Sequence, residues 1–203
     1  ENISVLNDAL YKLKNNLQYL YSNQSGDRYW YDTRPTLRKT AEDRASQMKD
    51  SDVEYEIEKR LKKLRNEKPF AGVHIAPSSS LDVPDEQQTR LVILRPDQTF
   101  KQNSRNSSGL ESAAEILNNR GTSPRIYKNM LAFVVPDESS IITLKNSVRK
   151  YLAWKSIKED SEELNLDAAQ NKETDNELMR SNENVILHLS EAYSWLLVPS
   201  IDR

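Results

Sequence analysis

The chain has 203 residues, of which 36% are hydrophobic and 30% charged, and its formal net charge is −2. This length suits one domain, or one domain with an appendage, and the absence of cysteine excludes disulfides and thiolate chemistry. A net charge so close to zero argues against nucleic-acid binding over the whole surface, although a local basic face stays open.

The first elements in the chain are a helix and a hairpin. Hydrophobic residues three and four positions apart predict an amphipathic helix that runs to about Asn16. Two aromatic segments, 19–21 and 28–31, flank a polar loop that contains Gly26, which predicts a β-hairpin. A helix followed by such a hairpin is typical of the end of a winged helix. The alternative, which we favour, is that Trp30 is largely buried and packs the hairpin against the first helix.

Two helices are predicted next. The segment Thr33-Arg34-Pro35-Thr36 ends the hairpin and begins the first of them, and Ser51-Asp52 caps the second. The second helix ends in a basic run, residues 59–65, which follows three glutamates by one turn. Acidic residues first and basic residues last is the order that the helix dipole favours. We therefore interpret this run as a solvent-facing surface and not as a phosphate site.

Three apolar runs predict the strands of a buried sheet. They lie at Val73–Ala76, Leu91–Arg95 and Leu131–Val135, and proline or glycine bounds them. A helix predicted over residues 110–119 separates the last two, which indicates a right-handed crossover between parallel strands. The expected fold class is therefore α/β, with a small, mostly parallel sheet covered by helices. We interpret His74, within the first run, as a core histidine.

After Asp137 the sequence predicts helices to the end of the chain. The last of these carries apolar residues from Leu178 to Leu196 and closes at Pro199. The expected divisions are residues 1–35 for the helix and hairpin (the possible end of a winged helix), 36–157 for the α/β core and 158–203 for a C-terminal helical segment.

The most informative segment is the turn at residues 118–125. Gly121 can adopt the positive φ that ends the preceding helix, and Pro124 stiffens the approach to the third strand. Two arginines, Arg120 and Arg125, lie in this turn. Ligands of α/β proteins gather where strands end, and a guanidinium group binds phosphate or carboxylate with two parallel hydrogen bonds.

We therefore expect Arg120 and Arg125, together with Arg34, to be candidate contacts for a phosphate or a partner. The alternative is that one of the two turn arginines pairs with Asp97, Asp137 or another local acid and only fixes the loop. In the first case, replacing both turn arginines leaves the stability of the chain nearly unchanged.

Several motifs are absent from the sequence. There is no Walker A motif, no G-x-S-x-G and no H-E-x-x-H, and four glycines leave no phosphate-cradling loop. The two histidines, His74 and His188, are too far apart in sequence to indicate zinc. No apolar run approaches the roughly 20 residues of a membrane span, and no signal peptide opens the chain. We expect a cytoplasmic chain with no catalytic residues, metal, cofactor or membrane contact of its own, and one that is a fragment because Glu1 already lies in a helical pattern.

A family resemblance spans residues from about 15 to the end. The segments that carry it are RYWYDTRPT at 28–36, AEDRA at 41–45, DVPD at 82–85, RLVILRP at 90–96, NRGTSPR at 119–125, NMLAF at 129–133, YLAW at 151–154, EAY at 191–193 and WLLVP at 195–199. In combination they resemble the latter part of a family of large predicted AAA+-type ATPases of unknown function that is associated with anti-phage defence loci. The family places its P-loop upstream, and this chain has none.

The resemblance implies a parent protein that uses ATP and Mg²⁺. This chain would be its non-catalytic module, relaying nucleotide state or contacting other domains of the polypeptide, a neighbouring protomer or a protein partner. The alternative is a nucleic-acid-binding module that uses the hairpin and nearby arginines. A third hypothesis is an enzyme whose site lies at the strand ends.

Overall fold

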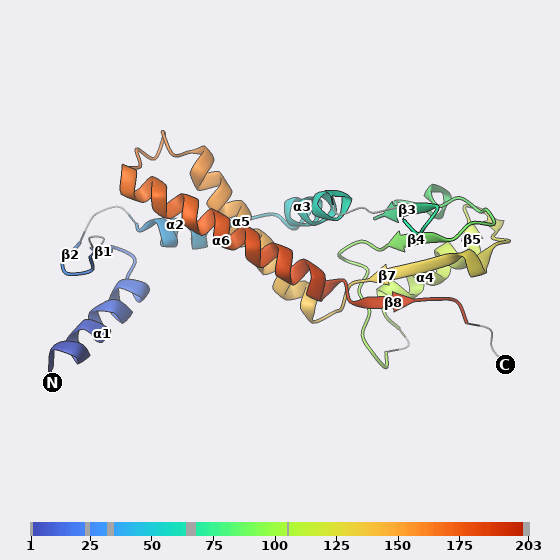
Figure 1. Cartoon of the computed structure of the whole chain (residues 1–203), viewed down its shortest axis with the longest axis horizontal. Coiled ribbons are helices and arrows are strands. Elements are labelled where there is room, and N and C mark those ends of the chain that lie inside the picture. Colours follow the sequence, from blue (N-terminus) through green and yellow to red (C-terminus); the bar gives the residue numbers. More distant parts are fainter. Residues whose placement is uncertain (1, 23–24, 32–34, 64–67, 105, 201–203) are drawn as a thin grey trace. The chain divides into compact units, whose positions relative to one another are not determined.

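The computed structural model describes residues 2–22, 25–31, 35–63, 68–104 and 106–200, with only the backbone described at 2–4, 14 and 15. The helices are α1 (Asn2–Asn16), α2 (Leu37–Gln47), α3 (Asp50–Lys63), α4 (Ser108–Asn118), α5 (Ser140–Glu159) and α6 (Ala168–Ala192), with 3-10 turns η1 (Ser80–Asp82) and η2 (Lys128–Met130) (Figure 1). The strands are β1 (Leu20–Ser22), β2 (Tyr29–Tyr31), β3 (Gly72–Ile75), β4 (Arg90–Ile93), β5 (Asn119–Arg120), β6 (Ser123–Pro124), β7 (Leu131–Val135) and β8 (Trp195–Leu197).

The chain forms two compact units, and the division falls within α5 and α6. The first unit comprises Glu1–Met48 and Leu152–Leu178, and the second comprises Lys49–Tyr151 and Met179–Arg203. Each is described by itself below. Both helices and small sheets are present, so the α/β class expected from the sequence is confirmed.

The second unit contains a four-stranded sheet in the order β3-β4-β7-β8. Strands β3, β4 and β7 are parallel, and their register pairs Val73 with Leu91 and Leu91 with Ala132. The three strands predicted from apolar runs are therefore confirmed as neighbours. Helix α4 makes the crossover from β4 to β7, as expected for a parallel pair.

Strand β8 was not predicted. Helix α6 ends at Ala192, and Trp195–Leu197 pairs antiparallel with β7, so the expectation of helix through residue 196 is wrong. The alternation of exposure explains the difference, because Trp195 and Leu197 pack against the core while Leu196 faces solvent. Three residues are too few for this alternation to stand out from the helical pattern that precedes it.

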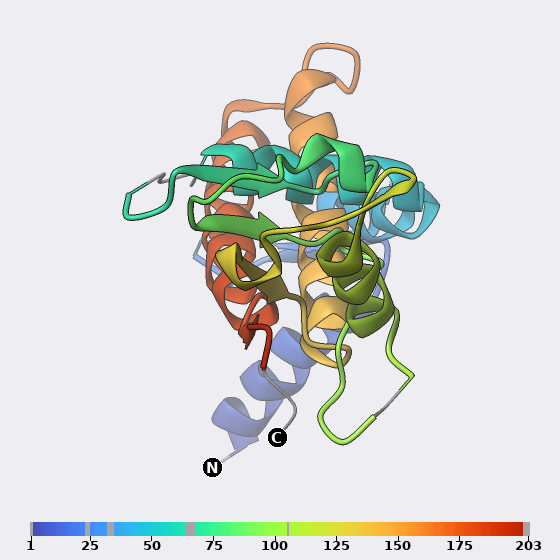
Figure 2. The ribbon, with the colours of Figure 1, turned by 90° about the vertical axis from the view of Figure 1, so that its right-hand side faces the viewer.

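The core of the second unit lies between the sheet and α4. Figure 2 shows α4 beside the strands, and its buried residues Ala113 and Ile116 cluster with Val92, Phe133 and Val135 from the sheet. The backbone approach is close at Gly109, where a Cβ atom would lie 2.5 Å from a methyl group of Val135. Glycine at this position therefore lets α4 settle on β7.

Helix α3 packs in the second unit through buried residues such as Ile57 and through polar links to α5 and α6. Lys145 forms an ion pair with Glu54 at 2.8 Å. Arg60 donates to Asn182 at 2.8 Å and lies 4.4 Å from the centre of the Tyr151 ring. The basic end of α3 is thus only partly the solvent-facing surface that we expected, because Arg60 faces inward.

The first unit has a small core of its own. Leu37 and Ala41 of α2 cluster with Ala153, Trp154 and Ile157 of α5. The α2 N-terminus begins as predicted: the side chain of Thr36 accepts a hydrogen bond from the Lys39 amide at 3.3 Å.

The β1–β2 hairpin of the first unit differs from expectation. Leu20 is its buried residue, whereas Trp30 is 46% exposed and Tyr31 is more exposed still. The ring of Trp30 stacks on Tyr21 across the strands, with 6.0 Å between ring centres. The expectation that Trp30 is largely buried is therefore wrong, because Leu20 fills the buried position and Trp30 packs on its cross-strand neighbour instead.

Candidate functional site

The turn with two arginines forms a small hairpin of strands β5 and β6. Gly121 lies at its tip with φ +61°, so its positive φ is as predicted, but its predicted role is wrong: it turns this hairpin, and α4 ends earlier, at Asn118, with Asn119 in an extended conformation. The hairpin follows α4 and precedes β7, so it lies at the edge of the sheet where the parallel strands begin. Ligands of α/β sheets gather at the opposite edge, where parallel strands end. The expectation that these arginines lie at the ligand-binding edge of the sheet is therefore wrong.

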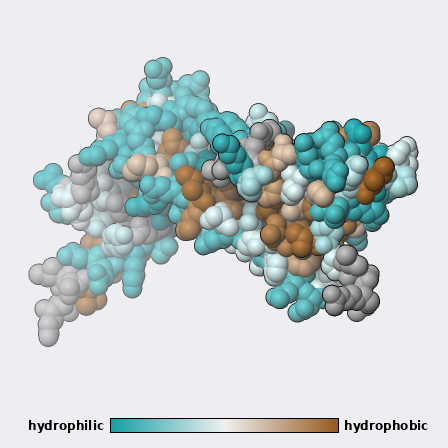
Figure 3. Space-filling view, turned by 45° about the vertical axis from the view of Figure 1, so that its right-hand side comes forward, coloured by the Kyte–Doolittle hydropathy of each residue, from teal (hydrophilic) through white to brown (hydrophobic). Residues whose placement is uncertain are grey.

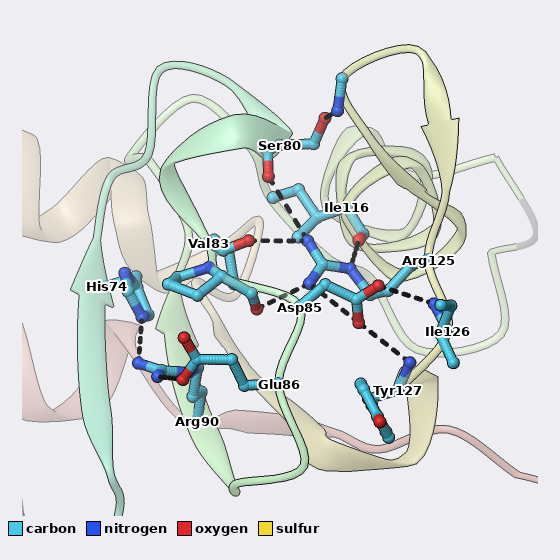
Figure 4. Close-up of polar contacts among 12 residues, drawn as sticks. His74, Ser80, Val83, Asp85, Glu86, Arg90, Ile116, Arg125, Ile126 and Tyr127 are labelled. Atoms are coloured by element: carbon cyan, nitrogen blue, oxygen red, sulfur yellow. Dashed lines mark hydrogen bonds and ion pairs between the residues drawn. The ribbon is translucent and has the colours of Figure 1, made fainter.

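Arg125 lies inside the protein, with only 3% of its surface exposed. Its Nε donates to the Ile116 carbonyl at 2.8 Å, and one terminal nitrogen donates to the Pro84 carbonyl at 2.8 Å. The other terminal nitrogen donates to the carbonyls of Val83 at 3.0 Å and Ser80 at 3.4 Å. Figure 4 shows the guanidinium group surrounded by these acceptors. It therefore ties η1 and the loop after it to the end of α4.

Asp85 completes this arrangement from the other side. Its carboxylate accepts hydrogen bonds from the amides of Ile126 at 2.8 Å and Tyr127 at 2.9 Å, and it lies 3.9 Å from Arg125 (Figure 4). Burial alone would raise the pKa of Asp85, but the two amide hydrogen bonds and the charges of Arg125 and Arg120 outweigh it, so the pKa is lowered. We call Arg125, Asp85 and the groups bonded to them the Arg125 hub.

The geometry of the hub favours the loop-fixing alternative for Arg125. Every hydrogen bond of its guanidinium group is made within the chain, and its side chain has no exposed surface with which to meet a partner. The acid beside it is Asp85, which sequence reasoning did not single out. No local signal could have found this pair, because its members lie 40 positions apart and the other acceptors are backbone carbonyls.

Arg120 has the opposite character. It is exposed on β5, and its side chain makes no hydrogen bond or ion pair with any residue that the structure describes. The tip beside it is held firmly, because the Gly121 amide donates to Ser80 Oγ at 2.9 Å. The hub thus supports a fixed hairpin that carries Arg120 at an exposed position, within the range of charge interaction with Asp85. The third candidate, Arg34, lies outside the described residues.

At the edge where the parallel strands end, the acidic residues Asp137 and Asp97 already form hydrogen bonds or ion pairs within the chain. Asp137 follows β7 and accepts hydrogen bonds from the backbone and hydroxyl groups of Ser139 and Ser140 and, at 3.0 Å, from Trp195 Nε1. These hydrogen bonds, that of the Ser139 hydroxyl first, hold the pKa of Asp137 well below its usual range. Asp137 therefore occupies the α5 N-terminus, where an anionic ligand would otherwise be attracted. Asp97, after β4, pairs with Arg95 at 3.0 Å.

The two histidines contact a serine and an arginine. His188 Nδ1 lies 2.7 Å from Ser147 Oγ, but no carboxylate among the described residues orients the ring, and Ser147 is buried within α5. His74 lies 3.4 Å from Arg90, which also pairs with Glu86 at 2.5 Å. The described residues contain no cluster of three or more histidine or carboxylate side chains that could hold a metal ion.

No helix within the described residues has the length and apolar character of a membrane span. Comparisons with known proteins matched no family, no curated protein and no solved structure.

Proposed function

We infer that this chain is a non-catalytic module of a larger cytoplasmic ATPase, in which it contacts another domain, a neighbouring protomer or a protein partner and so relays nucleotide state. The single observation that carries the proposal is the contrast between the two arginines of one turn: buried Arg125 fixes the backbone, and exposed Arg120 has only a charge interaction with Asp85 and no hydrogen bond among the described residues. A preorganised guanidinium group costs little to order when a carboxylate or phosphate arrives.

The remaining chemistry supports a module and not a self-contained enzyme. The acids at the strand ends are used as a helix cap and an ion pair. The donors at the α5 N-terminus are taken by Asp137, so the described residues there do not fit a nucleotide phosphate. ATP and Mg²⁺ accordingly belong, in this proposal, to the parent protein implied by the family resemblance.

The test compares Arg120→Ala with Arg120→Lys in the parent protein. We expect Arg120→Ala to lower ATP turnover by a factor on the order of 10³, as the loss of an arginine finger does. Lysine keeps the charge but loses the planar fork, so Arg120→Lys should recover only part of the rate. The melting temperature of the 203-residue chain should stay the same in both variants.

Unaltered turnover in Arg120→Ala would remove this residue from the relay. A reading frame with no Walker A motif upstream of Glu1 would remove the ATPase itself. The two failures are separate, because the first leaves the parent activity in place.

A second candidate function is nucleic-acid binding, and the exposure of Trp30 favours it. Exposed aromatic rings stack on bases, and Trp30 and Tyr31 both face solvent on the hairpin. Binding to single-stranded or duplex DNA should then weaken steeply with salt and be lost when the loop at residues 22–27 is shortened. Absence of binding at low salt would eliminate this candidate.

A further inference from the structure

The second unit carries an apolar groove that nothing in the described structure fills. It lies along α6 and α3, has a volume of about 560 Å³, and has Leu61 and Leu189 as its buried floor. Ile186 and Leu187 line it while remaining more than half exposed. The face drawn in Figure 3 is mostly hydrophilic, with several separate brown apolar patches. Exposed aliphatic side chains along a helix are typical of docking surfaces.

The groove carries one charged side chain. Glu183 is the one charged residue among its lining side chains, and it makes no hydrogen bond or ion pair with the described residues. Tyr193 also lines the groove. Burial raises the pKa of Tyr193, and the nearby carboxylates of Glu58, Asp97 and Glu54 raise it further. An occupant that matches this groove is therefore apolar along one side and carries a cation near Glu183.

Helix α1 has matching residues, and several of its described apolar side chains are exposed. Leu6, Leu10 and Leu13 follow the spacing of four and three that forms an apolar seam, and Leu6 and Leu13 are about half exposed. Lys12 lies at the edge of this seam and is exposed. The first unit therefore presents an amphipathic helix with exposed leucines and an exposed Lys12, and the second unit presents an apolar groove with an exposed Glu183.

We propose that the groove of one chain binds α1 of a second copy. The lengths agree when the two helices run antiparallel: Lys12 and Leu6 are six residues apart, and Glu183 and Ser190 are seven, so each pair spans about 10 Å. With Lys12 beside Glu183, the leucine seam lies over Ile186 and Leu187. An amphipathic helix laid into an apolar groove is a common recognition mode.

The contact joins two different surfaces, so two copies can either exchange their α1 helices in a closed dimer or repeat the contact head-to-tail. In both cases the mass of the assembly rises with concentration. This surface is separate from Arg120, and the inference does not depend on the proposed function.

The experiment is sedimentation of the 203-residue chain over a wide concentration range, with Leu6→Glu and Leu187→Glu as variants. Both side chains are more than half exposed, so neither change should unfold the chain. We expect the wild type to self-associate and each variant alone to be monomeric. A mixture of the two variants should form a complex that stops at a dimer, because it retains one intact α1 and one intact groove. Ile142→Glu, an equally exposed residue of α5 outside both surfaces, is the matched control and should associate as the wild type does.

A charge swap sharpens the test. Glu183→Lys should weaken association by up to about fivefold, which is the value of one exposed ion pair, and adding Lys12→Glu to it should restore the wild-type affinity. Three outcomes would overturn the proposal. They are a wild type that remains monomeric up to about 1 mM, a Leu187→Glu variant that still self-associates, and a mixture of variants that forms no dimer.

Discussion

The Arg125 hub and the β1–β2 hairpin contain the residues that the sequence makes most conspicuous. For Arg125 the structure favours the loop-fixing one of the two stated alternatives, because its side chain lies inside the protein, whereas Trp30, which was expected inside, is almost half exposed. The reason is which groups surround each side chain in the folded protein. Four backbone carbonyls and a carboxylate converge on Arg125, whereas Leu20 alone fills the buried position of the hairpin. Burial follows local hydrogen-bond and packing opportunities more closely than it follows residue type.

The largest effect that this comparison predicts is that of Arg125→Ala. Removing the guanidinium group leaves several carbonyls and the Asp85 carboxylate without their partner inside the protein, which should cost about 3–5 kcal/mol of unfolding free energy. Calorimetry should record a fall in melting temperature of roughly 6–20 °C for a chain of this size. A variant that melts with the wild type would mean that the hub does not hold the fold.

Asp85→Asn should have an intermediate effect that depends on pH. The pKa of Asp85 is lowered in the folded chain, so its charge stabilises the fold above the unfolded pKa of about 3.9. That contribution disappears as pH falls through the folded pKa. We expect the variant to be less stable by about 1–3 kcal/mol near neutral pH. The gap should close in acid, and a gap that is constant with pH would contradict the charge assignment.

Trp30→Ala should cost much less than a core aromatic does. Only the stacking on Tyr21 and part of the ring area are lost, so we expect about 0.5–1.5 kcal/mol. Denaturant unfolding measures this difference directly. A cost of about 3–5 kcal/mol, the range for a buried aromatic, would mean that Trp30 is covered after all and would weaken the nucleic-acid alternative.

Arg120→Ala should have the smallest effect on stability, within about 0.5 kcal/mol, as is usual at exposed positions. Its value lies in the contrast with Arg125, five positions along the same hairpin. Equal destabilisation by the two variants would remove the distinction between a structural arginine and an available one.

The sequence predicted the sheet well and the site poorly, for different physical reasons. Strands β3, β4 and β7 are apolar runs bounded by proline or glycine, a signal that lies entirely within each segment. The positive φ at Gly121 is likewise a local property. Strand β8 was not predicted, because three residues after a long helix are too few to show the alternation of buried and exposed side chains that marks a strand.

The hub could not be predicted, because all its bonds except that from Arg125 to Ile116 join residues 40 or more positions apart. Sequence reasoning recognised that a turn arginine might meet an acid and named Asp97 and Asp137, yet those carboxylates serve an ion pair and a helix cap. The carbonyls of Ile116, Val83 and Pro84 carry no residue-specific signature at all. Only the folded arrangement makes them acceptors.

The most direct test of the contrast between the two arginines is their reactivity in the native chain toward an arginine-specific dicarbonyl reagent, read by peptide mass spectrometry. The account predicts that Arg120 is modified while the chain is folded and that Arg125 is modified only after denaturation. Modification of both residues at the same rate in the native chain would contradict it.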